Sequence, residues 1–169
     1  MKMLKKLAAL ILAATMVLVL FTACGGDTTP TPEAQAETQI MSAINAKRPE
    51  GQKLQNNEQC RAIARQGIND VANGRNFGLS LNGSAFGYSS NVWLKMDGPK
   101  DGKCAFTLVT TFDYDGTKLN KFVQRIADGG NLGGANIAQS TKWTQVGVVV
   151  EAVNGKTYIA ISVAIDTNA

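Results

Sequence analysis

The stretch that decides the fold is VGVVVEAVNGKTYIAISVAI, residues 146–165. It contains two runs rich in β-branched residues, 146–153 and 157–165, and such runs favour strands. Between them, Asn154-Gly155 is the preferred two-residue turn of a β-hairpin. Because the two runs are apolar at nearly every position, we expect both faces of this C-terminal β-hairpin to be covered by other elements.

The preceding residues mix helical and strand patterns. Apolar side chains at helical spacing predict three helices, and short apolar runs bounded by turn residues predict two further strands. A loop rich in Gly, Ser and Asn should follow the second helix. We therefore predict an α+β fold, an α-β-α sandwich in which helices cover both sides of a small antiparallel sheet. The expected helices are 38–48, 57–72 (capped by Asn56 or Asn57) and 119–126, the loop is 75–90, and the strands are 91–96 and 104–112.

The N-terminus predicts export. Three lysines precede an uncharged, largely apolar run at 7–20, which is short for a membrane span and typical of a secretory signal. Thr22-Ala23-Cys24 resembles a bacterial lipobox, in which the cysteine is acylated, for example with palmitate, and becomes the new N-terminus. An ordinary signal peptide with a cysteine near its cleavage site is the alternative. The predicted parts are a lipoprotein signal peptide at 1–23, an acylated Cys24 with a flexible tether at 24–37, and one domain at 38–169.

The charge of the exported chain argues against one class of partner. The whole sequence has a formal net charge of +4, but residues 1–23 contain three lysines and no acidic residue. Without them, 14 basic and 13 acidic side chains remain, a net charge of +1. A nearly neutral domain has no general electrostatic attraction for nucleic acid, so we expect no nucleic-acid partner. We expect instead a lipid anchor in the cell membrane or outer membrane, with the domain facing away from the cytoplasm.

The other two cysteines, Cys60 and Cys104, form an even pair in a chain that is predicted to leave the cytoplasm. An oxidising compartment permits a disulfide between them, which would close a long loop and restrict the unfolded chain. We predict this disulfide. Two buried thiols are the alternative, because the sequence does not give the separation of the two Cα atoms.

Three short motifs, in this order, resemble the CAP superfamily, the group of cysteine-rich secretory, antigen 5 and pathogenesis-related-1 proteins whose domain is also called SCP. The motifs are IMSAINAKR at 40–48 with the helix that follows, GYSSNV at 87–92, and ANI at 135–137 leading to TQVGVVV at 144–150. The resemblance covers most of residues 38–165 and implies the fold of that family.

The resemblance also implies a ligand cleft, but one without the family's metal. Family members usually have two His and two Glu in this cleft, whereas this chain contains no histidine. Ser90 stands where the family has a glutamate, and Gly133-Gly134 stands where it has a His-Arg pair. We therefore expect no metal and no cofactor. The residues that the resemblance assigns to the cleft are Tyr88, Ser90, Asn91, Gly133 and Asn136.

The absence of histidine from the sequence excludes several catalytic sites. A Ser-His-Asp triad, a Cys-His pair and a histidine-containing zinc site all require an imidazole. We therefore expect no enzymatic activity and no catalytic residues. The predicted function is that of a cell-envelope lipoprotein whose non-catalytic CAP-like domain binds a lipid, a peptide or an envelope protein. The alternatives are an exported hydrolase that uses no histidine and a structural component of the envelope.

Overall fold

The computed structural model describes residues 30–46, 48–83, 90–100, 103–112, 120–121, 131–132, 135–136 and 143–166. The chain divides into two units, Met1–Pro30 and Thr31–Ala169, and all the described residues except Pro30 belong to the second unit. The predicted signal peptide lies outside the described residues, as does the predicted helix at 119–126 apart from residues 120–121.

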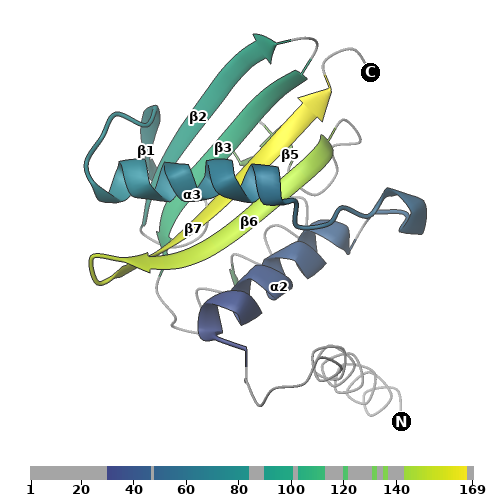
Figure 1. The fold of residues 1–169 in the computed structure, drawn as a ribbon, viewed down its shortest axis with the longest axis horizontal. Coiled ribbons are helices and arrows are strands. Elements are labelled where there is room, and N and C mark those ends of the chain that lie inside the picture. The colour runs from purple at the N-terminus through teal and green to yellow at the C-terminus, as the bar shows by residue number, and fades with distance from the viewer. Residues whose placement is uncertain are drawn as a thin grey trace. The chain divides into compact units, whose positions relative to one another are not determined.

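The described part of the chain is mixed α/β, with two α-helices and a five-stranded antiparallel sheet (Figure 1), and this confirms the predicted α+β class. The strands lie in the order β1-β2-β3-β7-β6, so that β1 and β6 are the two edges of the sheet. The helices are α2, Pro32–Asn45, and α3, Glu58–Ala72, with the short 3-10 helix η1, Glu50–Gln52, between them. The strands of the sheet are β1, Leu79–Gly83, β2, Ser90–Lys100, β3, Lys103–Phe112, β6, Trp143–Val153, and β7, Lys156–Asp166, and a separate pair is formed by β4, Asn131–Leu132, and β5, Ala135–Asn136.

Helix α3 begins where the sequence predicts it. The side chain of Asn57 accepts hydrogen bonds from the backbone N–H groups of Gln59 (3.0 Å) and Cys60 (3.1 Å), so Asn57 is the N-cap of the helix. A buried stripe along the helix then faces the sheet, and it consists of Cys60, Ala64, Gly67 and Ile68.

Helix α2 begins earlier than the predicted boundary at residue 38. The hydroxyl of Thr31 accepts a hydrogen bond from the Ala34 N–H at 3.3 Å, and Pro32 occupies the first helical position. The segment 32–37, predicted as part of a flexible tether, is therefore helical. Its small buried side chain, Ala36, continues the buried stripe of Ile40, Ala43 and Ile44, so the helix packs without a large apolar group in its first turns.

Strands extend beyond their predicted limits at one edge of the sheet. β1 lies inside the segment 75–90 that is predicted to be a loop, and it pairs with β2 from Leu79↔Leu94 to Gly83↔Ser90. β2 is also longer than the predicted strand at 91–96. Small polar residues have a low strand propensity, but pairing with a neighbouring strand overrides this weak preference.

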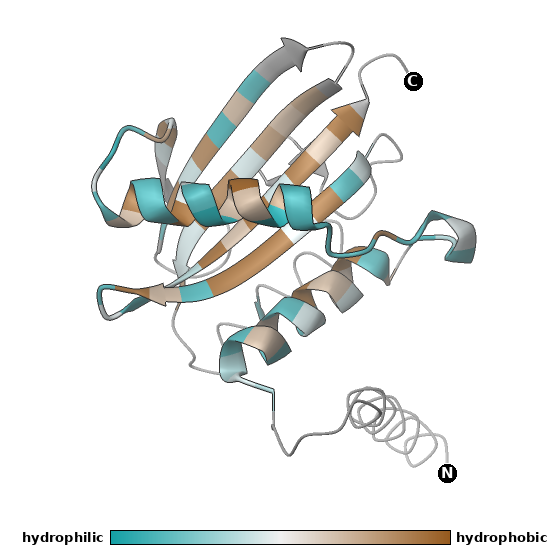
Figure 2. Ribbon diagram, viewed as in Figure 1, coloured by the Kyte–Doolittle hydropathy of each residue, from teal (hydrophilic) through white to brown (hydrophobic). Residues whose placement is uncertain are grey.

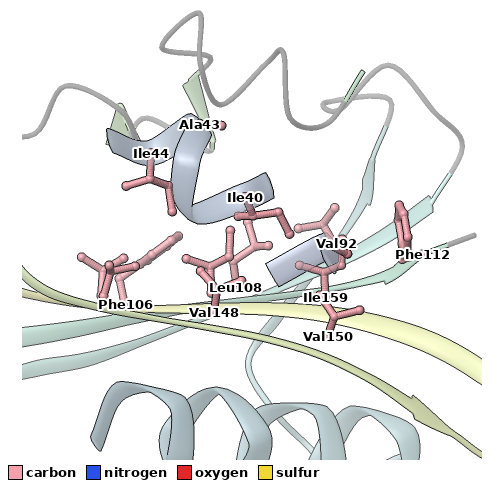
Figure 3. Close-up of a cluster of buried hydrophobic side chains, with 14 of the residues drawn as sticks. Ile40, Ala43, Ile44, Val92, Phe106, Leu108, Phe112, Val148, Val150 and Ile159 are labelled. Atoms are coloured by element: carbon pink, nitrogen blue, oxygen red, sulfur yellow. The ribbon is translucent and has the colours of Figure 1, made fainter. Parts of the chain in front are cut away.

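Each face of the sheet carries its own hydrophobic cluster. Successive side chains of a strand point to opposite faces, and along β6 Val148 and Val150 pack in the cluster of α2, whereas Val149 packs in the cluster of α3. The helices therefore contact opposite faces, and β6 and β7 are hydrophobic along most of their length (Figure 2). Figure 3 shows the larger cluster, in which Ile40 and Ile44 of α2 lie over the strands.

The crossing of α3 over β6 depends on one glycine. A Cβ atom at Gly147 would lie 2.2 Å from the backbone nitrogen of Arg61 and 2.3 Å from the carbonyl carbon of Cys60. These are backbone atoms of α3, so no side-chain rotation relieves the clash. Gly147 thus permits the helix backbone to lie directly on the strand.

Candidate functional site

The structure describes only part of the predicted ligand cleft. Three predicted site residues lie outside the described residues: Cys24, Tyr88 and Gly133. Ser90 and Asn91 lie in β2, whereas Asn136 lies in β5, which belongs to the separate two-stranded sheet. Asn91 is exposed, and its carbonyl oxygen accepts a hydrogen bond from the hydroxyl of Thr110 at 3.1 Å. The cleft therefore stays a prediction.

The two described cysteines, Cys60 and Cys104, are free thiols, so the predicted disulfide between them is not present in the structure. Cys104 lies on β3 at alternate positions with Phe106 and Leu108, so it faces the α2 side of the sheet. Cys60 is buried on α3, which packs on the other side. The sheet therefore separates the two sulfur atoms. Burial raises the pKa of the Cys60 thiol above its ordinary value, and a backbone hydrogen bond from Ala164 lowers it by less.

An open groove of about 760 Å³ lies along α2 and the connection that leads to α3. Its lining combines apolar side chains, Met41 and Leu54, with the ion pair between Lys53 and Glu50. Asn45 holds the two walls together, because its side chain donates to the Leu54 carbonyl at 2.8 Å and accepts from the Leu54 N–H at 2.9 Å. The groove is open to solvent and offers both apolar and charged contacts.

The outer edge of β6, at one end of this groove, is covered by the connection that precedes α3. The backbone N–H of Asn57 donates to the carbonyl of Val146 at 2.8 Å. The side chain of Asn56 accepts from the Val148 N–H at 2.7 Å and donates to the Val148 carbonyl at 3.1 Å. One amide side chain therefore takes the place of a neighbouring strand at Val148.

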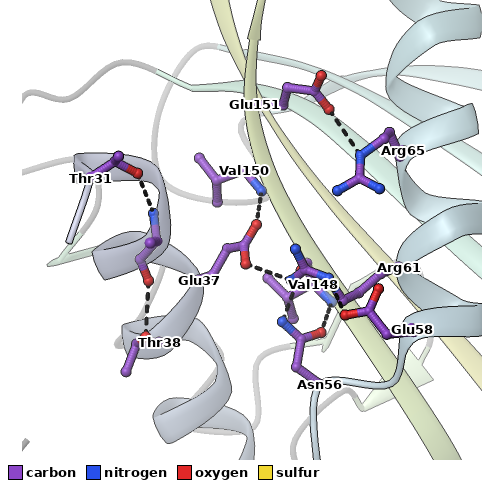
Figure 4. A network of polar contacts seen from close by, with 11 residues as sticks. Thr31, Glu37, Thr38, Asn56, Glu58, Arg61, Arg65, Val148, Val150 and Glu151 are labelled. Atoms are coloured by element: carbon purple, nitrogen blue, oxygen red, sulfur yellow. Dashed lines mark hydrogen bonds and ion pairs between the residues drawn. The ribbon is translucent and has the colours of Figure 1, made fainter. Parts of the chain in front are cut away.

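An ion pair between the two helices continues this cover along β6 (Figure 4). Glu37 of α2 accepts from the Val150 N–H at 3.0 Å and from Arg61 of α3 at 2.5 Å. Arg61 also donates to the Val148 carbonyl at 2.9 Å and lies 3.3 Å from a carboxylate oxygen of Glu58. The Arg61 and Glu37 side chains are only 17% and 15% exposed. We call Glu37, Asn56, Asn57 and Arg61 the β6 clamp.

Sequence reasoning missed the β6 clamp because it assigned Glu37 to the tether. A local signal for the earlier helix was present in Thr31-Pro32-Glu33, which combines a capping residue, a proline and an acid in the order that starts helices. The partners of Glu37 carry no such signal, because Val150 is separated from it by most of the domain.

Within the described ranges, no three or more Cys, Asp or Glu side chains lie together in a way that could hold a metal ion. Among the helices of those same ranges, none is both long enough and apolar enough to cross a bilayer. No family model, curated protein or solved structure matches this chain. The resemblance to the CAP superfamily therefore rests on the sequence motifs.

Proposed function

We propose that this chain is a cell-envelope lipoprotein, anchored through an acylated Cys24, whose folded domain binds a partner without catalysing a reaction. The observation that carries the proposal is the groove along α2, the first described helix after the predicted anchor. Concave sites that combine apolar surface with a few polar groups are the usual form of small-ligand and peptide sites. The lipid, peptide or protein segment that we propose as the ligand would use both kinds of contact.

The early start of α2 supports a ligand at the membrane. Cys24 and Thr31 are separated by a short segment that spans at most about 25 Å even when fully extended. An acylated Cys24 would therefore hold α2, and the groove beside it, close to the membrane surface. We infer that the ligand belongs to the membrane or is bound to it.

The proposal extends to the finer fold, an α-β-α sandwich of the CAP type with a C-terminal β-hairpin. Packing of α2 and α3 on opposite faces of the sheet supports the sandwich. The antiparallel pairing of β6 and β7, with positive φ angles at Asn154 (52°) and Gly155 (73°), supports the hairpin. In such a domain, the cleft predicted from the motifs would be a second candidate surface for the ligand.

The anchor is tested by expressing the chain in bacteria with a palmitate analogue and separating membrane from soluble fractions. We expect the full chain to carry the label and to sediment with membranes, and Cys24→Ser to lose both properties. Cys60→Ser, which removes a thiol inside the domain, is the matched control and should keep them. Unlabelled membrane fractions, or equal labelling of both variants, would refute the lipoprotein.

Ligand binding is tested by native mass spectrometry of the full chain, purified in detergent without chelator. We expect a retained organic mass that disappears in Ser42→Arg, because exposed Ser42 lines the groove. Gln39→Arg places the same side chain on an exposed position of α2 outside the groove and should keep the mass. Equal retention by both variants would exclude the groove, and a bound metal would favour the enzymatic alternative.

A further inference from the structure

The sheet has two edge strands, and the outer edge of β1 differs from the outer edge of β6. β1 lies at one end of the strand order, and among the described residues it pairs with β2 alone. Among the described residues, no backbone hydrogen bond from outside the sheet reaches β1, whereas the Asn57 N–H donates to the Val146 carbonyl of β6. An edge of this kind is a template for another strand.

β1 also lacks two of the features that usually prevent such pairing, charge and proline. Proteins protect open edges with charged residues, especially lysine, or with proline. Residues 76–94, which contain β1 and the start of β2, include no charged residue and no proline. The absence of charge over this whole segment means that nothing in its side chains repels an approaching strand of the same sequence.

Exposed apolar side chains gather at the same edge. Leu79 is 62% exposed and Met96 is 72% exposed. Leu79 pairs directly with Leu94, and Met96 follows Leu94 by two positions on β2, so all three side chains face the same side of the sheet. The open edge is therefore flanked by apolar surface on one face.

We propose that β1 pairs with β1 of a second copy of this chain, antiparallel and about a two-fold axis, and so joins two sheets into one. A two-fold junction places the same segment on both sides, which requires that the segment tolerates itself. The uncharged segment 76–94 meets this requirement, since no like charges come together. Leu79 and Met96 of the two copies would then extend one apolar surface across the junction.

The junction should be weak in solution. A strand of five residues offers a handful of backbone hydrogen bonds and buries much less than the roughly 1,200 Å² of a stable interface. Association should therefore depend on concentration, with monomer and dimer exchanging.

The test is light scattering coupled to size exclusion on the full chain in detergent, over a range of protein concentrations. We expect the protein mass to rise from monomer towards dimer, and Leu79→Lys to weaken the association by at least about tenfold, because it places a charge on each side of the junction. Ile63→Lys makes the same change on α3, at a position 42% exposed, and should leave the association unchanged. A monomer at all concentrations, or equal effects of the two variants, would overturn the proposal.

A second measurement needs no variant. Amide hydrogen exchange of the β1 segment, followed by mass spectrometry, should slow as the protein concentration rises, because a larger fraction of the chains is then in the dimer. Exchange that stays constant while the mass doubles would show that the dimer uses another surface, and would also overturn the proposal.

Discussion

The two edges of the sheet, β6 and β1, can be compared directly, because both belong to the same five-stranded sheet. Backbone groups of β6 at Val146, Val148 and Val150 are bonded by residues from α2, α3 and the segment between them. β1, in contrast, pairs on one side alone within the described residues. A hydrophobic edge strand can therefore be closed by a connecting segment and a few polar side chains instead of a further strand, and this protein closes β6 in that way.

The largest effect is expected where α3 crosses β6. Gly147→Ala should lower the free energy of unfolding by at least about 3 kcal/mol, because the new Cβ would overlap the α3 backbone and force the helix away from the strand. Urea unfolding measures the change. Gly51→Ala is the matched control, since nothing lies within 4 Å of its added Cβ. Similar midpoints for the two variants would contradict this account of the crossing.

The ion pair of the β6 clamp should give the next largest effect. Glu37→Ala leaves Arg61 without its buried partner and the Val150 N–H without an acceptor, which should cost about 2–4 kcal/mol. Glu37→Gln should cost less, because its amide oxygen can still accept from Val150. The control is Glu50→Ala, whose carboxylate is 88% exposed in its pair with Lys53 and should contribute less than about 1 kcal/mol. Equal losses from Glu37→Ala and Glu50→Ala would show that the clamp does not stabilise the edge.

Asn56 provides a smaller and more local test of the same edge. Asn56→Ala removes both hydrogen bonds to Val148 and should cost about 1–3 kcal/mol, measured by thermal unfolding. Asn69→Ala makes the same change at an exposed position of α3 and should have little effect. A neutral Asn56→Ala would mean that water replaces the side chain at β6 without loss.

The smallest effect on stability is expected from the thiol of Cys60, a buried residue of α3. Because burial raises the pKa of Cys60 in the folded state, folding favours the protonated thiol. The contribution of this thiol to the free energy of unfolding is fully present below its ordinary pKa of 9.0. The contribution is lost as the pH rises above that value and through the higher pKa of the folded state. Cys60→Ala should remove this part of the decrease in unfolding experiments above pH 9. In the native protein, a thiol reagent should modify the half-buried Cys104 before the buried Cys60. A mass of the wild-type chain that is lower by two hydrogens would contradict this expectation and show that the two cysteines form a disulfide.

Local signals in the sequence account for the elements that were predicted well. Asn57 caps α3 by bonding to residues two and three positions away, and the Asn154-Gly155 turn is equally local. Only the coarse fold class follows from such signals. β1 was missed because its polar residues resemble a loop, and it becomes a strand through pairing with β2.

The candidate site could be predicted less well, because it depends on contacts between distant residues. Glu37 contacts Val150 only after α2 and β6 have come together. The positions of Cys60 and Cys104 on opposite sides of the sheet depend on which face each element covers, and an even number of cysteines says nothing about this. The groove likewise forms between α2 and a connection that is held by Asn45.

Residue-resolved amide hydrogen exchange by NMR tests the contrast between the two edges most directly. It should be measured at a protein concentration where the chain is monomeric. The N–H groups of Val148 and Val150 donate hydrogen bonds to the side chains of Asn56 and Glu37. We predict that these two N–H groups exchange at least about tenfold more slowly than the outward N–H groups of β1, because their hydrogen bonds break only when the clamp opens. Exchange at Val148 and Val150 that is as fast as at the β1 edge would contradict the clamp and the account of this fold that depends on it.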